Sequence, residues 1–264
     1  MMNAQRQQRA SDLLWDSWLR GRKLPELPVD LRPGTREEGY AIQALLEGHS
    51  AAPLFGWKIA ATSAAGQTHI GVDGPIAGRL LAERAQASGG SMSLEGNGMR
   101  VAEPEFAFRM SRDLAPRAQP YTVDEVLDAV ASLHPAIEVP DSRYVDFVRV
   151  GAPQLIADCA CAHHFVLGDA TPANWRVMDL VEHAVIGEVE GKTRREGKGA
   201  NVLGDPRVAL TWLANELSRL SITLRSGQII TTGTCMVPLT VFTGDRVSAD
   251  FGTLGRVSVA FTGR

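Results

Sequence analysis

The segment RVAEPEFAFRM (100–110) carries two glutamates, Glu103 and Glu105, separated by one residue. In a strand, alternate side chains share a face, so both carboxylates would lie on one side and Phe106 and Phe108 on the other, which must face the core. Along such a strand the two carboxylates would lie about 6.6 Å apart, close enough to bind one ion. Oxygen ligands of this type suit a hard cation, Mg²⁺ or Mn²⁺. Spacing alone fits a solvated strand face equally well, and that is the commoner case.

A third carboxylate follows in HPAIEVPDSRY (134–144). Ile137 and Val139 would point to one side of a strand and Glu138 to the other. A helix between the two acidic strands would allow both to direct their acids inward, which would bring Glu138 beside the first pair. Alternatively, Glu138 forms a structural ion pair with Arg143 in the turn that follows.

One lysine, Lys58, lies in the apolar segment PLFGWKIAATS (53–63), between Trp57 and Ile59. A lysine in a buried strand either extends to solvent or is paired with charged partners. Beside a carboxylate-bound metal, its ammonium could hold the carboxylate or enolate oxygen of a substrate.

The run IADCACAHHFVLG (156–168) suggests a zinc site, because Cys159, Cys161 and His163 would alternate on one face of a strand. Structural zinc sites usually contain cysteine pairs with two to four residues between them. Since this run lies between apolar segments, we expect small buried thiols instead. The chain contains no P-loop, no Gly-x-Gly-x-x-Gly and no Gly-x-Ser-x-Gly motif, so nucleotide binding and serine hydrolysis lack support.

The elements that must position these residues follow from periodicity and end signals. Helices are expected at 4–20, from Thr35 to about Gly48, from Thr122 to about Leu133 and after the Asp205-Pro206 pair. The segment 186–204 predicts a β-hairpin, and the C-terminal part predicts further strands. The loop 87–98 marks a seam, so we expect a helical and mixed part at 1–86, which could form a lid, and a β-rich metal-binding catalytic domain at 87–264.

Composition sets the broad class. The 264 residues are 44% hydrophobic and 22% charged, which is ordinary for a globular protein. Lys and Arg number 27 against 30 Asp and Glu, a near-neutral balance that favours neither nucleic acid nor an anionic membrane as partner. No signal peptide and no apolar run of roughly 20 residues is recognisable. Three cysteines fit a reducing compartment. We therefore expect a cytoplasmic enzyme.

Taken in order, several segments resemble a known family: GWKIAATS, GVDGPIAGRLL, AEPEFAF, AIEVPDSRY, LIADCACAHHFVLG, GANVLGDPRVALTWLANEL and TTGTCMVPLTVFTGDRV. They are similar to the 2-oxopent-4-enoate hydratase and 4-oxalocrotonate decarboxylase group of the fumarylacetoacetate hydrolase-like superfamily. The resemblance covers nearly the whole chain, and Glu-x-Glu followed by a distant Glu is its metal signature. It implies an α+β fold, a mixed β-sheet roll of the fumarylacetoacetase C-terminal type with a small helical N-terminal part, assembled as a homo-oligomer.

The resemblance also implies a site. Glu103, Glu105 and Glu138 would bind one Mg²⁺ or Mn²⁺, Lys58 would be the catalytic residue, and Asp158 and Thr234 would contact the substrate. The implied function is that of a metal-dependent lyase in aromatic-compound catabolism. It would either decarboxylate a 4-oxalocrotonate-like acid or hydrate a 2-oxopent-4-enoate-like acid. In both cases the metal would chelate the 2-oxo acid and stabilise the enolate.

One position departs from the hydratase pattern. By resemblance, hydratases carry Pro-Asp-x-Gly at the turn where this chain has Pro75-Ile76-Ala77-Gly78. Hydration needs a group that moves protons at the distal carbon, which Ile76 cannot do. Decarboxylation needs chiefly an electron sink and one protonation, and the decarboxylase branch also has isoleucine here.

Two other functions stay open. An acylpyruvate-type C–C hydrolase would need a water-activating pair near the metal, and His49 with Glu47 or His69 with Asp73 are the candidates. A non-catalytic partner subunit would keep the fold and the metal site while docking a sister enzyme of the same pathway.

Overall fold

Two long antiparallel strands, β5 (Val101–Met110) and β6 (Val130–Val139), form the centre of the computed structural model, which describes residues 2–263. The remaining strands are β1 (Gly56–Ala60), β2 (Ile76–Leu80), β3 (Ala85–Ala87), β4 (Ser91–Ser93), β7 (His164–Leu167), β8 (Ala184–Val189), β9 (Thr193–Lys198), β10 (Ile229–Thr234), β11 (Leu239–Thr240), β12 (Arg246–Asp250) and β13 (Arg256–Thr262). The helices are α1 (Ala4–Leu19), α2 (Arg36–Ala44), α3 (Ala64–Ile70), α4 (Val123–Leu127), α5 (Ala152–Ala157) and α6 (Pro206–Arg219).

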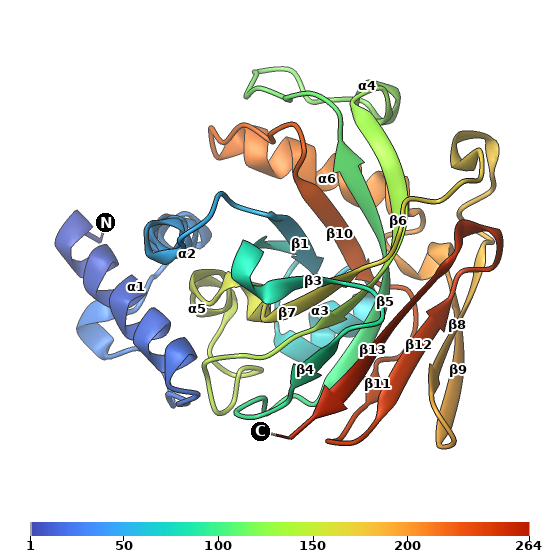
Figure 1. Cartoon of the computed structure of the whole chain (residues 1–264). Coiled ribbons are helices and arrows are strands. Elements are labelled where there is room, and N and C mark those ends of the chain that lie inside the picture. Colours follow the sequence, from blue (N-terminus) through green and yellow to red (C-terminus); the bar gives the residue numbers. More distant parts are fainter. Residues whose placement is uncertain (1, 264) are drawn as a thin grey trace.

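The strands form two curled sheets. The larger, mixed sheet has the order β2-β1-β10-β5-β6-β7-β3, and β11 pairs with the end of β5. The smaller sheet has the order β4-β13-β12-β8-β9. In Figure 1, strands β12, β8 and β9 of the smaller sheet lie to the right of β5 and β6, whereas α1 and α2 lie on the opposite side of the molecule. Phe106 and Phe108 of β5 are fully buried in the main core.

Local end signals set the helices where the sequence predicted them. The Asn3 side chain caps α1 and the Thr35 hydroxyl caps α2. The Asp205 carboxylate caps α6, with Pro206 at its first position. The hairpin β8–β9 and the C-terminal strands are also confirmed.

Two expected elements are wrong. The helix after Thr122 has its complete capping box but ends at Leu127, and Leu133 is a buried strand residue. Pairing with β5 along the length of β6 outweighs the local helical pattern, because it provides hydrogen-bond partners for the backbone N–H and C=O groups of both strands.

The second error concerns 156–168, which is not one strand. Helix α5 ends at Ala157, a 3₁₀ turn with positive φ at all three residues spans Cys159–Cys161, and β7 starts only at His164. Cys159, Cys161 and His163 therefore share no strand face. The turn is held by buried side chains: Lys58 Nζ donates to the Ala160 carbonyl at 2.9 Å, and Arg143 donates to the carbonyl of Ala162 at 2.8 Å.

The part of the chain before residue 87 is joined to the rest through the larger sheet. Strands β1 and β2 belong to residues 1–86, yet β1 runs parallel to β10 from the C-terminal part and pairs with it. The boundary expected at residue 86 thus separates strands of one sheet, and the division into two parts stays a prediction.

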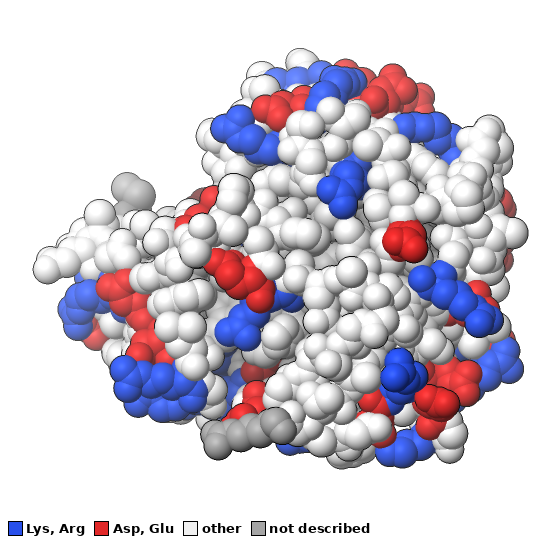
Figure 2. Space-filling model, viewed as in Figure 1, with Lys and Arg blue, Asp and Glu red and all other residues white. Residues whose placement is uncertain are grey.

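The surface carries both signs of charge. On the face drawn in Figure 2, Lys and Arg alternate with Asp and Glu around the rim, and uncharged residues occupy much of the centre. Across residues 2–263 no helix has both the length and the apolar character that crossing a membrane requires.

Candidate active site and metal centre

The pairing of β5 with β6 brings three glutamates together. Glu103 lies directly opposite Glu138, and Glu105 lies one pleat further along the same face. One carboxylate oxygen of each residue lies within 4.8 Å of those of the other two. Glu105 and Glu138 are fully buried, so the interpretation as a solvated strand face is wrong for them.

The surroundings of the cluster fit a cation. Glu105 Oε2 accepts hydrogen bonds from the Thr231 hydroxyl and, at 2.7 Å, from the Gly233 N–H. Within the described residues, Glu105 Oε1 and Glu138 Oε1 accept none, although both are buried. Buried carboxylate oxygens left without donors, aimed at one another, are the donor set of a hard divalent ion.

The electrostatics of the cluster agree with this. Burial, followed by the repulsion of Glu138, raises the pKa of Glu103 to about 7. Burial also raises the pKa of Glu105 well above its ordinary value, with Glu138 and Glu103 adding to the shift. The pKa of Glu138 is raised by burial and lowered in part by Lys58, with a net rise. Three negative charges are therefore unfavourable in this space unless a cation offsets them.

Lys58, in the middle of β1, supplies one positive charge. Its Nζ lies 3.2 Å from Glu138 Oε2, and the side chain is almost completely buried. Burial lowers the pKa of Lys58, but the attraction of Glu138, Glu103 and Glu105 outweighs it and raises that pKa, so the group is an ammonium. The expected ion pair of Glu138 with Arg143 is wrong, because Arg143 pairs with Asp158 instead.

A cavity of about 990 Å³ opens over this cluster. Lys58 and Glu103 line it, together with residues of α3, of the loop carrying Phe147 and of the segment 233–238. Thr234 lies in this lining, and so does Ile76, the residue at which the family resemblance predicted an acid for a hydratase. Among the described lining residues, the ionisable side chains are Lys58, His69, Glu103 and Cys161.

The structure does not bring every predicted site residue to this cavity. Asp158 is absent from the lining; its carboxylate binds Arg143 and accepts a hydrogen bond from the Ser142 hydroxyl at 2.7 Å. The cause is the buried Arg143 guanidinium, which needs a carboxylate partner. The three cysteines are free and buried, and the metal-ligand group found among residues 2–263 contains glutamates alone.

The two histidine–acid pairs are also separated. His49 Nε2 lies 3.3 Å from Asp12, and Glu47 binds Arg79; none of these lines the cavity. His69 does line it, but Asp73 pairs with Arg36 rather than with His69.

Sequence reasoning missed the residues that hold Glu105. Thr231 and Gly233 lie on β10, whose register is irregular between Thr231 and Thr234. Gly233 itself was the available signal, because a glycine among strand residues often marks a bulge or a close approach of backbone. Gly233 has φ +95°, and a Cβ there would lie 2.2 Å from the Thr62 hydroxyl.

Comparison with known proteins places the chain in a family. A model of the fumarylacetoacetate hydrolase C-terminal family matches residues 81–262. The 2-keto-4-pentenoate hydratase of Burkholderia vietnamiensis is 34% identical over 245 residues, which are 92% of each chain. A 4-oxalocrotonate decarboxylase from a Pseudomonas species is 30% identical over 258 residues, 97% of this chain and 98% of the relative.

A solved structure extends the match to the fold. The 4-oxalocrotonate decarboxylase from Pseudomonas putida G7, complexed with magnesium and adipate, superposes with a TM-score of 0.89 at 25% identity and covers 99% of both chains. The predicted α+β sheet roll with a small helical N-terminal part is thereby confirmed. The chain belongs to the fumarylacetoacetate hydrolase C-terminal family, and its relatives there include 2-keto-4-pentenoate hydratases and 4-oxalocrotonate decarboxylases.

Proposed function

We propose that the chain is a divalent-metal-dependent lyase of aromatic-compound catabolism that decarboxylates a short, unsaturated 2-oxo dicarboxylic acid of the 4-oxalocrotonate type. The observation that carries the proposal is the group of Glu103, Glu105 and Glu138 beside Lys58, of which Glu105 and Glu138 are fully buried. Ile76, which by the family resemblance occupies the position of the hydratase acid, lines the same cavity.

Glu103, Glu105 and Glu138 would hold Mg²⁺ or Mn²⁺, whose positive charge would offset the charge that develops on the 2-oxo acid oxygens. Lys58 is fixed by the Ala160 carbonyl and Glu138, so its ammonium can donate a further hydrogen bond to a substrate oxygen without reorganising. Thr234, also in the lining, would contact the substrate through its hydroxyl.

The cavity wall favours decarboxylation over hydration. When the bond to the distal carboxylate breaks, CO₂ leaves and the electron pair enters the conjugated 2-oxo system, so a single protonation completes the reaction. Hydration must add both a hydroxyl and a proton, which needs a positioned acid or base near the distal carbon. Ile76 is fully buried and cannot transfer protons.

Hydration is the second candidate, because the relative with 34% identity is a 2-keto-4-pentenoate hydratase. His69, on α3, would then be the group in the wall that moves the proton. C–C hydrolysis has less support, since the His49–Glu47 pair lies outside the lining. A non-catalytic partner subunit would keep the same metal group without turnover.

The deciding measurement is CO₂ release from 2-oxohex-3-enedioate with Mg²⁺, with Mn²⁺, and after chelation. Metal-dependent CO₂ supports the proposal. No CO₂, together with hydration of 2-oxopent-4-enoate, would transfer the assignment to a hydratase. If a broad panel of 2-oxo acids is turned over by neither the wild type nor Lys58→Ala, the chain is a partner subunit.

We further propose assembly as a homo-oligomer, a complex with a sister enzyme of the pathway and a cytoplasmic location. Support for assembly comes only from the family resemblance, and light scattering of the purified chain tests it.

A further inference from the structure

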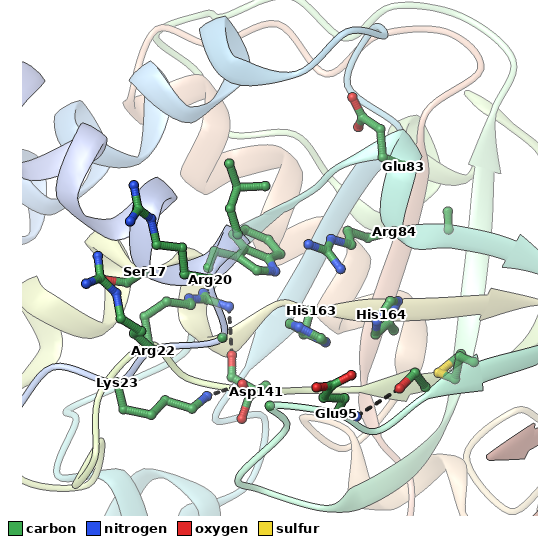
Figure 3. Close-up of a pocket in the computed structure, with 18 of the residues that line it drawn as sticks. Ser17, Arg20, Arg22, Lys23, Glu83, Arg84, Glu95, Asp141, His163 and His164 are labelled. Atoms are coloured by element: carbon green, nitrogen blue, oxygen red, sulfur yellow. Dashed lines mark hydrogen bonds and ion pairs between the residues drawn. The ribbon is translucent and has the colours of Figure 1, made fainter. Parts of the chain in front are cut away.

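A second cavity, of about 750 Å³, lies where the end of α1 and the following connector meet β3, β4 and β7. It shares no lining residue with the cavity over the three glutamates. Figure 3 shows basic side chains around this cavity. Arg20, Arg22 and Lys23 come from the connector after α1, whereas Arg84 precedes β3 and His163 and His164 lie at the start of β7.

Most of the cations in this lining already have a carboxylate partner. Arg20 and Arg22 both bind Asp16, and Lys23 binds Asp141. Arg143 is paired with Asp158.

Arg84 differs from them. It forms no ion pair with a carboxylate of the described part of the chain, and its guanidinium carbon instead lies 5.4 Å from the centre of the Trp18 ring. Its neighbour Glu83 is bound by the Ser50 hydroxyl and the Ala51 N–H. Arg84 thus brings to the cavity a positive charge that no ion pair among the described residues holds.

Two buried nitrogens next to Arg84 also lack partners among residues 2–263. His163 is 9% exposed and its Nδ1 makes no hydrogen bond. The Trp18 Nε1–H, on a ring stacked 5.8 Å from that of His163, has no acceptor. Buried polar groups of this kind are normally satisfied, so their occurrence together points to an acceptor that binds between them.

The charge of the site selects the ligand. Burial, His164, Arg143, Arg84 and Lys23 lower the pKa of His163, so its ring is neutral at pH 7 and offers one N–H without adding charge. Asp141 and Glu95 also line the cavity and disfavour a second negative charge on the ligand. Arg84, which has no ion pair among the described residues, together with neutral N–H donors matches a monoanionic carboxylate better than a phosphate dianion.

We propose that this cavity is a second binding site, which takes the carboxylate group of a small organic acid between Arg84, the Trp18 indole N–H and His163 Nδ1. The proposal does not depend on which reaction takes place in the cavity over the three glutamates, called the glutamate cavity below. Its position gives it a structural link to that cavity: Asp141, in the second lining, accepts a hydrogen bond at 2.8 Å from the N–H of Gly98, which lines the first.

The test uses the full chain labelled with 5-fluorotryptophan, freed of metal by chelation and desalting. The chain has five tryptophans, and Trp18→Phe assigns the ¹⁹F resonance of Trp18. Sodium acetate replaces sodium chloride at constant ionic strength. We expect a saturable shift of the Trp18 resonance, with inorganic phosphate binding more weakly.

The variant Arg84→Gln should weaken acetate binding on the order of tenfold or more, because a charge-assisted hydrogen bond is lost. His163→Phe, which keeps the ring stack but lacks Nδ1, should weaken it independently. Arg112→Gln, an exposed arginine outside both linings, is the matched control and should leave it unchanged.

Three outcomes count against the proposal. No saturable shift in the wild type, or equal acetate affinity in wild type, Arg84→Gln and His163→Phe, would show an ordinary water-filled cavity. Tighter binding of phosphate than of acetate would reject the carboxylate assignment. Because the readout is acetate binding to metal-free protein rather than turnover, a failure here is distinguishable from a failure of the proposed function.

Discussion

Lys58 is the residue whose replacement should affect chemistry most directly. It lines the glutamate cavity, and its ammonium is held in place by Glu138 and the Ala160 carbonyl. Lys58→Met keeps the length of the side chain but removes the charge, so we expect kcat/KM for the 2-oxo acid to fall on the order of 100-fold or more. Lys198→Met, at an exposed pair with Glu182, should behave as the wild type. Equal kinetics for both variants would remove Lys58 from the mechanism.

Glu105 should decide metal binding. Glu105→Gln can still accept from the Gly233 N–H, but it lacks the charge that a divalent ion needs. Calorimetry should show Mg²⁺ binding to the wild type and none to this variant. Glu188→Gln, at an exposed strand position, should bind as the wild type does. Unchanged Mg²⁺ binding by Glu105→Gln would contradict the assignment of the three glutamates.

Metal removal should also affect stability in a residue-specific way. Without a cation, Glu103, Glu105 and Glu138 repel one another in a buried space. Chelation should therefore lower the Tm of the wild type, and added Mg²⁺ should restore it by mass action. The Tm of Glu105→Gln should respond to neither. A wild-type Tm that is independent of Mg²⁺ would show that the cluster holds no ion.

At this scale, the sequence predicted that the three glutamates and Lys58 lie together, and it missed the residues that hold Glu105. The alternation of Glu103 and Glu105 is a local pattern, and a lysine among apolar neighbours is visible in one segment. Asp158 does not line the cavity, because in the folded chain its carboxylate pairs with the buried Arg143. Thr231 meets Glu105 only through the pairing of β10 with β5, which no local signal encodes.

The glycine of β2 sets how closely neighbouring elements approach Lys58. Gly78 lies opposite Lys58, and a Cβ at this position would lie 2.0 Å from the Cys159 carbonyl oxygen and 3.1 Å from Lys58 Cγ. Gly78→Ala must push the 3₁₀ turn or β1 away, so we expect a loss of about 1–3 kcal/mol in unfolding free energy, together with reduced kcat.

A neighbouring glycine provides the control for this prediction. A Cβ added at Gly74 would meet no heavy atom within 4 Å, and the backbone there has no positive φ. Gly74→Ala should therefore leave the unfolding midpoint and kcat unchanged. If Gly78→Ala is as stable and active as Gly74→Ala, close packing of β2 on the turn does not position Lys58.

Helices whose ends are marked by capping residues were predicted well. Elements whose conformation depends on pairing with distant parts of the chain were not. The caps of α1, α2 and α6 are encoded within a few residues, so these helices were found. Strand β6 begins within the stretch expected to be helical, because β5 offers it a complete pairing partner. The turn at Cys159–Cys161 depends on donors from Lys58 and Arg143, one of which lies far away in the sequence.

At the scale of the whole molecule, Arg143 connects the helical N-terminal elements to the sheet. It follows β6, its guanidinium carbon lies 4.2 Å from the centre of the Trp18 ring on α1, and it donates to the Ala162 carbonyl before β7. Asp158 is the carboxylate that neutralises it, and both side chains are at least 98% buried. The contact of Trp18 on α1 with the turn that follows β6 therefore depends on this buried ion pair.

Replacing Asp158 should consequently act on the stability of the whole fold. Asp158→Asn leaves the Arg143 charge buried without a counter-charge, which costs about 3–5 kcal/mol. The unfolding midpoint in denaturant should fall accordingly, while KM of the remaining folded enzyme should not change, because Asp158 lies outside the glutamate cavity. Asp113→Asn, at an exposed pair with Arg225, should change stability by less than about 1 kcal/mol. A raised KM with unchanged stability would instead support Asp158 as a substrate contact. A residue that binds the substrate directly can raise KM when it is replaced without changing the free energy of unfolding.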